Sequence, residues 1–322
     1  MLVALASLLV LFALIRLAIW AVTSFLKWLE GGKKVSASME EQFVEDGRAN
    51  ELRTYAQELD DERSLRHLGE EVKGERPMLT VEERKELKRD SAEAREAYLG
   101  ELKLTWYQIV VIFLVGSVLG LIIEEIWMFV TAGLTESRVG LVWGPYSPIY
   151  GFGAVLLTIA CWKMRKSGAT WWQVFLISMV VGGLLEQVTG WGMETLIGAV
   201  SWDYTSVPGC ITKWVAWPFL FFWGALGLVW SKAIMPELLF RIGNPTTMRQ
   251  IVFVSLLALY LAADIFMTVA CFGRMAARDA GIAPANPFEE WVDENYTDQF
   301  IAARFQNMTI SSATEREAQE RA

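Results

Sequence analysis

Residues 171–198 decide the fold, and they read WWQVFLISMVVGGLLEQVTGWGMETLIG. This run is long and apolar enough to cross a bilayer, for which a helix needs about 20 residues. It nevertheless contains two acids, Glu186 and Glu194. Because a carboxylate at mid-membrane depth costs roughly 2.5–3.5 kcal/mol on insertion scales, chains keep such groups mainly to pair, hydrate or use them. The run therefore predicts a transmembrane helix that faces a polar site.

Apolar segments of similar length recur along the chain. Six are long enough to span a membrane, at residues 2–26, 106–130, 146–163, 171–198, 214–235 and 250–272. The third is marginal because it begins in a run rich in glycine and proline. Hydrophobic residues make up 53% of the chain, above the roughly 45–50% usual in soluble domains. We expect an all-α, polytopic transmembrane bundle of about six spans, embedded as a multi-pass protein in the cell membrane.

The spans divide the chain into four parts, which are an N-terminal span at 1–26, a charged linker at 27–105, a transmembrane core at 106–272 and an amphipathic tail at 273–322. The first segment lacks the basic start and the cleavage site of a signal peptide, so we expect it to be retained. In the linker, S/T-x-x-E motifs at Ser38 and Thr80 predict helix starts.

The distribution of basic residues around the spans predicts the topology. It places the linker in the cytoplasm and both termini outside. In the tail, apolar residues between 288 and 305 recur at near-helical spacing. They predict an interfacial helix that lies on the membrane surface or on the protein itself.

Composition argues against several function classes. A net charge of −8 without a basic face argues against nucleic-acid binding. The single histidine, His67, lies in the linker, and the three cysteines are widely spaced, so neither histidine catalysis nor a zinc site is expected. No G-x-x-x-x-G-K-[ST] loop occurs in the sequence, so the chain has no P-loop for ATP. We expect no cofactor, and any ATP dependence would require a separate ATPase subunit.

Carboxylates inside the predicted spans are the main candidates for a site. Glu186 and Glu194 project about 80° apart on one helix, so both can face a bundle interior. Glu124 and Glu125 are adjacent and project about 100° apart, so only one can face a narrow cavity. The deeper position of Glu124 favours that residue. Asp264 lies in the middle of the last span and meets the same cost argument.

A stretch rich in glycine and proline follows the second span. Residues 138–153 read RVGLVWGPYSPIYGFG, a composition that disfavours a regular helix. Irregular backbone at membrane depth survives only when it is buried in protein or lines a water-filled cavity. We therefore expect a re-entrant or mouth-lining loop, with an ordinary surface turn as the alternative. Arg138 is the natural partner there for a carboxylate or an anionic headgroup.

At the end of the fourth span, Trp202 and Tyr204 suit the membrane interface, and Asp203 either caps the turn or joins the acidic site. The metal content of the site is left open. The candidate substrate- or ion-binding residues are Glu124, Glu125, Arg138, Tyr150, Glu186, Glu194, Trp202, Asp203 and Asp264.

Several of these stretches together resemble a family of bacterial integral membrane proteins described as putative ABC-transporter type IV, or permease-like. They are IIEE at 122–125, the run at 138–153, LLEQVTGWGME at 184–194, WDYTSVP at 202–208 and YLAADIF at 260–266. Where the family usually has a Gly-Arg pair, this chain reads CITKW at 210–214, so Lys213 is at best a substitute. The resemblance implies the membrane fold of a transporter component and does not indicate a substrate.

Three functions from different classes fit these patterns. The first is a permease-like transporter component whose carboxylates and arginine line a polar site. The second is an intramembrane enzyme acting on a lipid or lipid-linked substrate through paired carboxylates. The third is a non-catalytic scaffold whose linker recruits a cytoplasmic partner. Because the polar residues concentrate in the spans and the resemblance points the same way, we favour the first.

Overall fold

The computed structural model describes residues 95–310 except 134, 135 and 246, together with residues 16, 20–26, 28, 29, 85, 89 and 92. Most of the predicted first span and of the charged linker lies outside the described residues. The chain forms two compact units. The first contains Val110–Met235 and the described part of Ser255–Ala322, and the second contains Pro236–Val254 and the described part of Thr23–Ile109.

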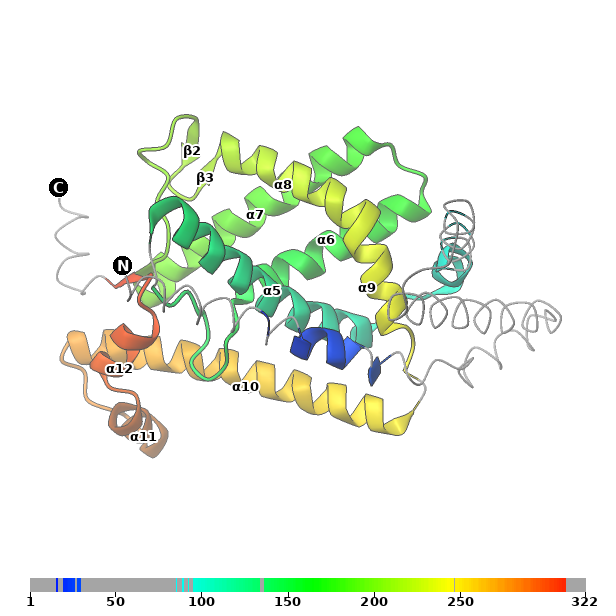
Figure 1. Ribbon diagram of the computed structural model, residues 1–322. Coiled ribbons are helices and arrows are strands. Elements are labelled where there is room, and N and C mark those ends of the chain that lie inside the picture. The colour runs from blue at the N-terminus through cyan, green and yellow to red at the C-terminus, as the bar shows by residue number, and fades with distance from the viewer. Residues whose placement is uncertain are drawn as a thin grey trace, which may run out of the picture. The chain divides into compact units, whose positions relative to one another are not determined.

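Helices dominate the described residues (Figure 1). They are α5 (Trp106–Ala132), α6 (Pro148–Lys166), α7 (Trp171–Ile197), α8 (Trp217–Val229), the π-helical turn η1 (Trp230–Ile234), α9 (Met235–Ile242), α10 (Met248–Asp279), α11 (Pro287–Asn295) and α12 (Asp298–Arg304). Two short antiparallel pairs complete the fold. They are β1 (Ala199–Val200) with β4 (Thr309–Ile310) and β2 (Cys210–Thr212) with β3 (Val215–Ala216).

Within the described residues, four helical stretches are long and apolar enough to cross a membrane, namely Trp106–Ala132, Trp171–Thr195, Trp217–Ile242 and Met248–Asp279. They match four of the six predicted spans, and the all-α membrane bundle is confirmed. Six spans are not. The predicted segment 146–163 forms α6, which has 19 residues and carries three basic residues in its last turn. It is not among the described helices that are long and apolar enough to cross a membrane.

The helix α6 also corrects the prediction for the run at 138–153. Residues 136–147 are irregular as expected, but Pro148 opens a regular helix. Proline is tolerated in the first turn because the amide that it lacks would have no intrahelical partner there. The following glycines then serve packing rather than irregular backbone. A Cβ at Gly151 would lie 2.2 Å from the Ser117 hydroxyl of α5.

Glycines let the helices of the first unit approach closely, and α7 packs against both α6 and α8 (Figure 1). On α5, a Cβ at Gly120 would lie 2.2 Å from the Cβ of Tyr150. On α7, a Cβ at Gly182 would lie 2.0 Å from Cγ of Trp223. At each glycine, the missing side chain leaves room for an aromatic ring of the neighbouring helix.

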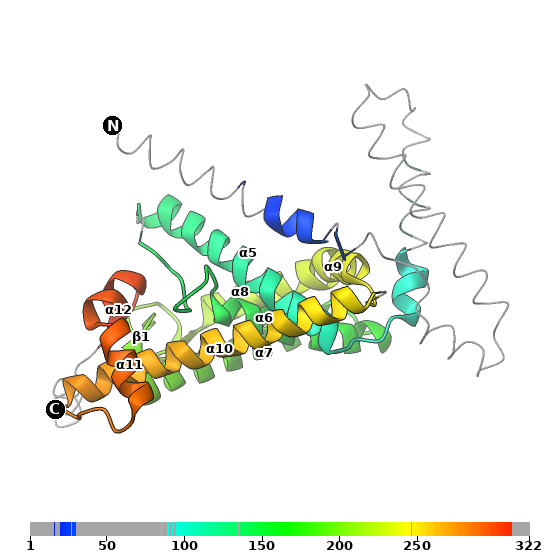
Figure 2. The ribbon, with the colours of Figure 1, turned by 90° about the horizontal axis from the view of Figure 1, so that it is seen from below.

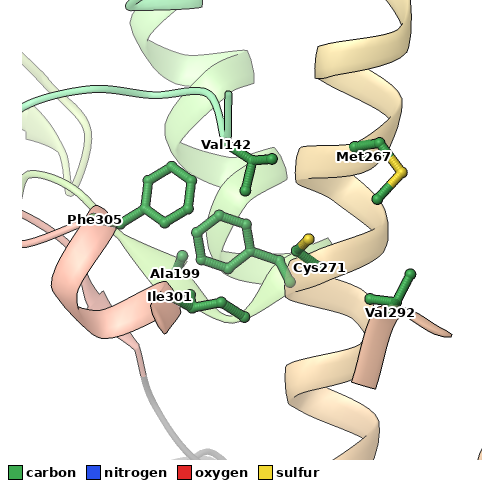
Figure 3. Packing of buried hydrophobic residues seen from close by; sticks show 8 residues of the cluster. Val142, Ala199, Met267, Cys271, Val292, Ile301 and Phe305 are labelled. Carbon is green, nitrogen blue, oxygen red and sulfur yellow. The ribbon is translucent and has the colours of Figure 1, made fainter. Parts of the chain in front are cut away.

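The tail forms two short helices, α11 and α12, rather than the single helix predicted over 288–305. Thr297 separates them because its hydroxyl caps the start of α12. Both lie beside the C-terminal part of α10 (Figure 2). Val292, Ile301 and Phe305 are buried in a cluster with Phe272 of α10 (Figure 3). The tail therefore docks on the protein, and its placement at a membrane surface stays a prediction.

The second unit is held by polar contacts among segments far apart in sequence. The Gln108 side-chain amide donates to the carbonyl of Gly243 at 2.7 Å. The Asn244 amide donates to the Tyr98 hydroxyl at 3.0 Å, and burial raises the pKa of Tyr98 to about 12. Arg95 pairs with Glu237 of α9 at 3.1 Å. These contacts fix the short loop that joins α9 to α10.

Candidate functional site

Glu186 is a buried carboxylate in the middle of α7, with 7% of its surface exposed. One oxygen, Oε1, accepts a hydrogen bond from the Trp223 indole of α8 at 3.0 Å. The other, Oε2, is buried and has no hydrogen-bond partner among the described residues. Gly182, one helical turn earlier, leaves room for the Trp223 ring, so the indole can approach the Glu186 carboxylate. Glu186 is therefore only half satisfied.

The two faces of α7 explain why Glu186 points inward. Val180, Leu184, Val188 and Trp191 recur at three- and four-residue spacing, and each is more than half exposed. They form one apolar stripe on the outer face of the helix. Glu186 projects from the opposite side, where α8 packs. An exposed apolar stripe and an inward acid thus lie on opposite sides of the same helix.

Arg138 and Glu124 form an ion pair in the first unit. The Arg138 Nη1 lies 3.0 Å from the Glu124 Oε1, and both side chains are largely buried. Glu125 instead receives a long contact of 3.5 Å from the backbone amide of Arg138. Of the two adjacent acids, Glu124 is therefore the one that meets the guanidinium, as its position in the span favours. The Nε of Arg138 has no partner among the described residues.

Two tyrosines extend this pair toward Glu186. The Tyr150 hydroxyl of α6 donates to the Glu124 carboxylate, which the close approach at Gly120 permits. Tyr204 follows α7 and stacks on Phe219, with ring centroids 4.3 Å apart. Burial raises the pKa of Tyr204 well above its usual value, and the carboxylates of Glu186 and Glu124 raise it further. Tyr204 therefore lies near both acids.

Glu194 lies two turns beyond Glu186 and is neutralised separately. Its Oε1 lies 2.6 Å from the Lys213 ammonium, between β2 and β3. About a third of each side chain is exposed to solvent. Lys213 provides the counter-charge for Glu194. The structure does not give Glu194 a contact with the Arg138–Glu124 pair.

The predicted residues Trp202 and Asp203 hold the connection after α7. The Trp202 indole donates to the Trp214 carbonyl at 3.1 Å. Asp203 accepts from the hydroxyl of Thr205 at 2.6 Å and from its amide at 2.8 Å. The pKa of Asp203 is lowered by these two bonds with Thr205. Of the two roles considered for Asp203, the structure shows the turn cap.

Asp264 is fully buried on α10 and anchors the loop that follows Arg138. Its two carboxylate oxygens accept from the backbone amides of Trp143 at 3.0 Å and of Gly144 at 3.2 Å. Thr268, one turn later, accepts from the amide of Val142 at 3.0 Å. Both oxygens of Asp264 are thus engaged by protein. The residue supports the loop and is not placed with Glu186.

The tail holds the same loop from its other side. The guanidinium of Arg304 in α12 donates to the carbonyls of Leu141 and Gly144, with the shortest distance 2.6 Å. The Gln306 side chain accepts from the amide of Ser137 at 2.9 Å, immediately before Arg138. Amides bound by Asp264 and carbonyls bound by Arg304 fix the backbone between 137 and 144. Arg138 is thereby presented to Glu124.

Sequence reasoning did not single out Trp223 or Arg304, and it assigned Tyr204 only to the membrane interface. Trp223 is one of many tryptophans, and only its packing on Gly182 distinguishes it. Arg304 lies in a polar tail far from the motifs. For a metal, no group of three or more His, Cys, Asp or Glu residues that could hold an ion occurs in the part of the chain that the structure describes.

Comparison with known proteins gives one match, which lies in the core of the chain. Residues 111–269 match the model of a family described as Putative ABC-transporter type IV. The match covers α6, α7, α8 and most of α5 and α10, and it includes every residue of the candidate site. It confirms the resemblance seen in the sequence. No curated protein and no solved structure gives a significant match.

Proposed function

We propose that this membrane protein of a transporter-type family is a multi-pass, permease-like component of the cell membrane, driven by a separate ATPase subunit. The family match and the four membrane-capable helices support a membrane transporter. The sequence contains no P-loop, so ATP hydrolysis is assigned to a partner. In this proposal, Glu124, Arg138, Tyr150 and Glu186 line the polar site, and Asp264 holds its loop.

The observation that carries the proposal is the half-satisfied carboxylate of Glu186 inside an apolar helix. A purely structural acid is normally paired or fully hydrogen-bonded, because burying an unpaired charge is costly. Glu186 has instead one neutral donor and a free oxygen. The nearby Arg138–Glu124 pair supplies both signs of charge to the same region. Such a combination is typical of intramembrane groups that bind a polar or charged ligand.

The test begins with crosslinking in native membranes, followed by purification of the tagged full-length chain. We expect recovery of a protein that has a P-loop and hydrolyses ATP. The complex should be compared with the Glu186→Gln variant and with Glu194→Gln as the matched control. Glu186→Gln should leave expression intact but abolish the effect of this chain on the rate at which its partner hydrolyses ATP. Glu194→Gln should change that rate little.

Two outcomes would overturn the proposal. The first is purified chain in nanodiscs that hydrolyses ATP by itself and loses this activity when one of its own residues is changed. The second is a Glu186→Leu variant that behaves as the wild type in the complex. Turnover of a lipid by the isolated chain would favour the intramembrane enzyme instead.

A further inference from the structure

Three acids of the membrane-capable helices in the first unit are satisfied by the protein. Glu124 has the guanidinium of Arg138 at 3.0 Å, and Glu194 has the ammonium of Lys213 at 2.6 Å. Asp264 has a backbone amide on each oxygen. Each of these three acids therefore has either a cation or a full set of donors.

Glu186 has neither. Its single described partner is the Trp223 indole, which carries no charge, and its Oε2 is buried without a donor. No positively charged group of the described residues is recorded as acting on it. Tyr204, from the connection after α7, is a neutral phenol, and it lies near the carboxylate of Glu124 as well. The Arg138 charge is already used by Glu124.

A buried carboxylate in this setting is stabilised by one added positive charge. An ionised acid in an apolar interior is costly unless it is paired. A proton or a bound cation at Oε2 would remove that cost and occupy the free oxygen. We propose that Glu186 reversibly takes up one monovalent positive charge, as a proton or an alkali cation, during the working cycle of the protein. This inference rests on the proposed polar site but not on the ATPase.

The chemistry of the surrounding groups favours a monovalent charge over a divalent metal. Divalent cations such as Ca²⁺ and Mg²⁺ prefer several oxygen ligands with more than one carboxylate. At Glu186 the structure offers one carboxylate oxygen and a neutral phenol, because Glu124 is committed to Arg138. One added positive charge neutralises the Glu186 carboxylate. The experiment distinguishes the two sources of that charge, a proton from water and an alkali cation from salt.

The experiment uses the full-length chain in nanodiscs. In the proton arm, infrared difference spectra recorded on acidification should show the carbonyl band of a protonated carboxylic acid. In the cation arm, NaCl should raise the melting temperature above that in choline chloride of equal ionic strength, because a ligand stabilises the state that it binds. We expect one of the two signals in the wild type, its loss in Glu186→Gln, and its retention in the matched control Glu194→Gln.

A second variant protects the test against loss of folding. Glu186→Asp keeps the charge but withdraws the carboxylate, so the signal should persist at a shifted pH or Na⁺ concentration. The inference is overturned if neither arm separates the wild type from a folded Glu186→Gln variant, or if Glu194→Gln loses the signal equally. If an ATPase still co-purifies and couples in that case, the proposed transporter stands without this ion. If the signal appears but no ATPase is found, the uptake of a positive charge by Glu186 stands without the proposed ATPase partner.

Discussion

Asp264 and Glu186 are both buried acids in apolar helices, yet they differ in how many of their carboxylate oxygens are hydrogen-bonded. Asp264 on α10 gives both oxygens to the amides of one loop. Glu186 on α7 gives one oxygen to an indole and leaves the other free. Burial and sequence context are similar for the two residues, so neither distinguishes support from function. The hydrogen bonds that remain open distinguish them.

The largest effect that would test this contrast is the loss of Asp264. Asp264→Ala should lower the free energy of unfolding by about 4 kcal/mol, because each buried amide that loses a charged acceptor costs about 1–3 kcal/mol. Glu186→Gln, which removes the charge and keeps the size of the side chain, should leave stability unchanged or raise it. Denaturant titration in detergent micelles measures both variants. Equal losses in the two variants would remove the distinction between the acids.

The Arg138–Glu124 pair should come next. Arg138→Ala strands a largely buried carboxylate and should cost about 3 kcal/mol, the lower end of the range for buried pairs. The reason for the lower end is that 12% of the Arg138 side chain and 21% of the Glu124 side chain are exposed. The double variant with Glu124→Ala should recover much of this loss.

The matched double variant combines Arg138→Ala with Glu194→Ala, whose side chain pairs with Lys213 instead. The losses of these two changes should add. Additive losses with Glu124→Ala and coupled losses with Glu194→Ala would contradict the pairing of Arg138 with Glu124.

Gly182 tests the contrast because it positions Trp223, the one hydrogen-bond donor to Glu186 among the described residues. In Gly182→Ala, the new Cβ would lie 2.0 Å from the Trp223 ring, so the indole must shift. Overpacking of this kind costs about 1–3 kcal/mol, and we expect about 2. Because Trp223 is displaced, the pH or the Na⁺ concentration at which the Glu186 signal appears should also shift. Gly192→Ala on the same helix meets nothing within 4 Å and serves as the control.

The smallest effect concerns Asp293, a fully satisfied acid outside the spans. Its pKa is lowered from 3.8, first by the hydrogen bonds of Arg274 and then by those of Arg278. Because the folded-state pKa is below the unfolded value, the stabilisation is present above 3.8 and is lost as the pH falls through the lower folded value. Limited proteolysis should therefore show a docked tail from pH 7 to about pH 4.

In Asp293→Asn, the tail should be looser at neutral pH and lose this dependence on acid. A tail that is released in the wild type between pH 6 and pH 5 would contradict the assignment, since those values lie above the ordinary range of an aspartate.

Much of the architecture could be predicted from the sequence, because span length and apolar content are local properties. The intramembrane acids and Arg138 could be recognised for the same reason, since charge in an apolar run is visible without a structure. The pairings could not. Glu124 and Glu125 differ only in direction, and the capture of the 141–144 loop by Asp264 joins residues about 120 positions apart. Trp223 becomes a partner of Glu186 only because Gly182 leaves room for its ring.

The contacts of Arg304 and Gln306 also set an order in time. A ribosome synthesises a chain from its N-terminus, so the residues of α5 to α10 are made before residues 304–306. Until then, the carbonyls of Leu141 and Gly144 and the amide of Ser137 lack the partners that hold them in the finished fold. The loop that carries Arg138 can therefore reach its final form only after residues 304–306 have been synthesised. Arg304 and Gln306 are made later than every residue that they hold in place.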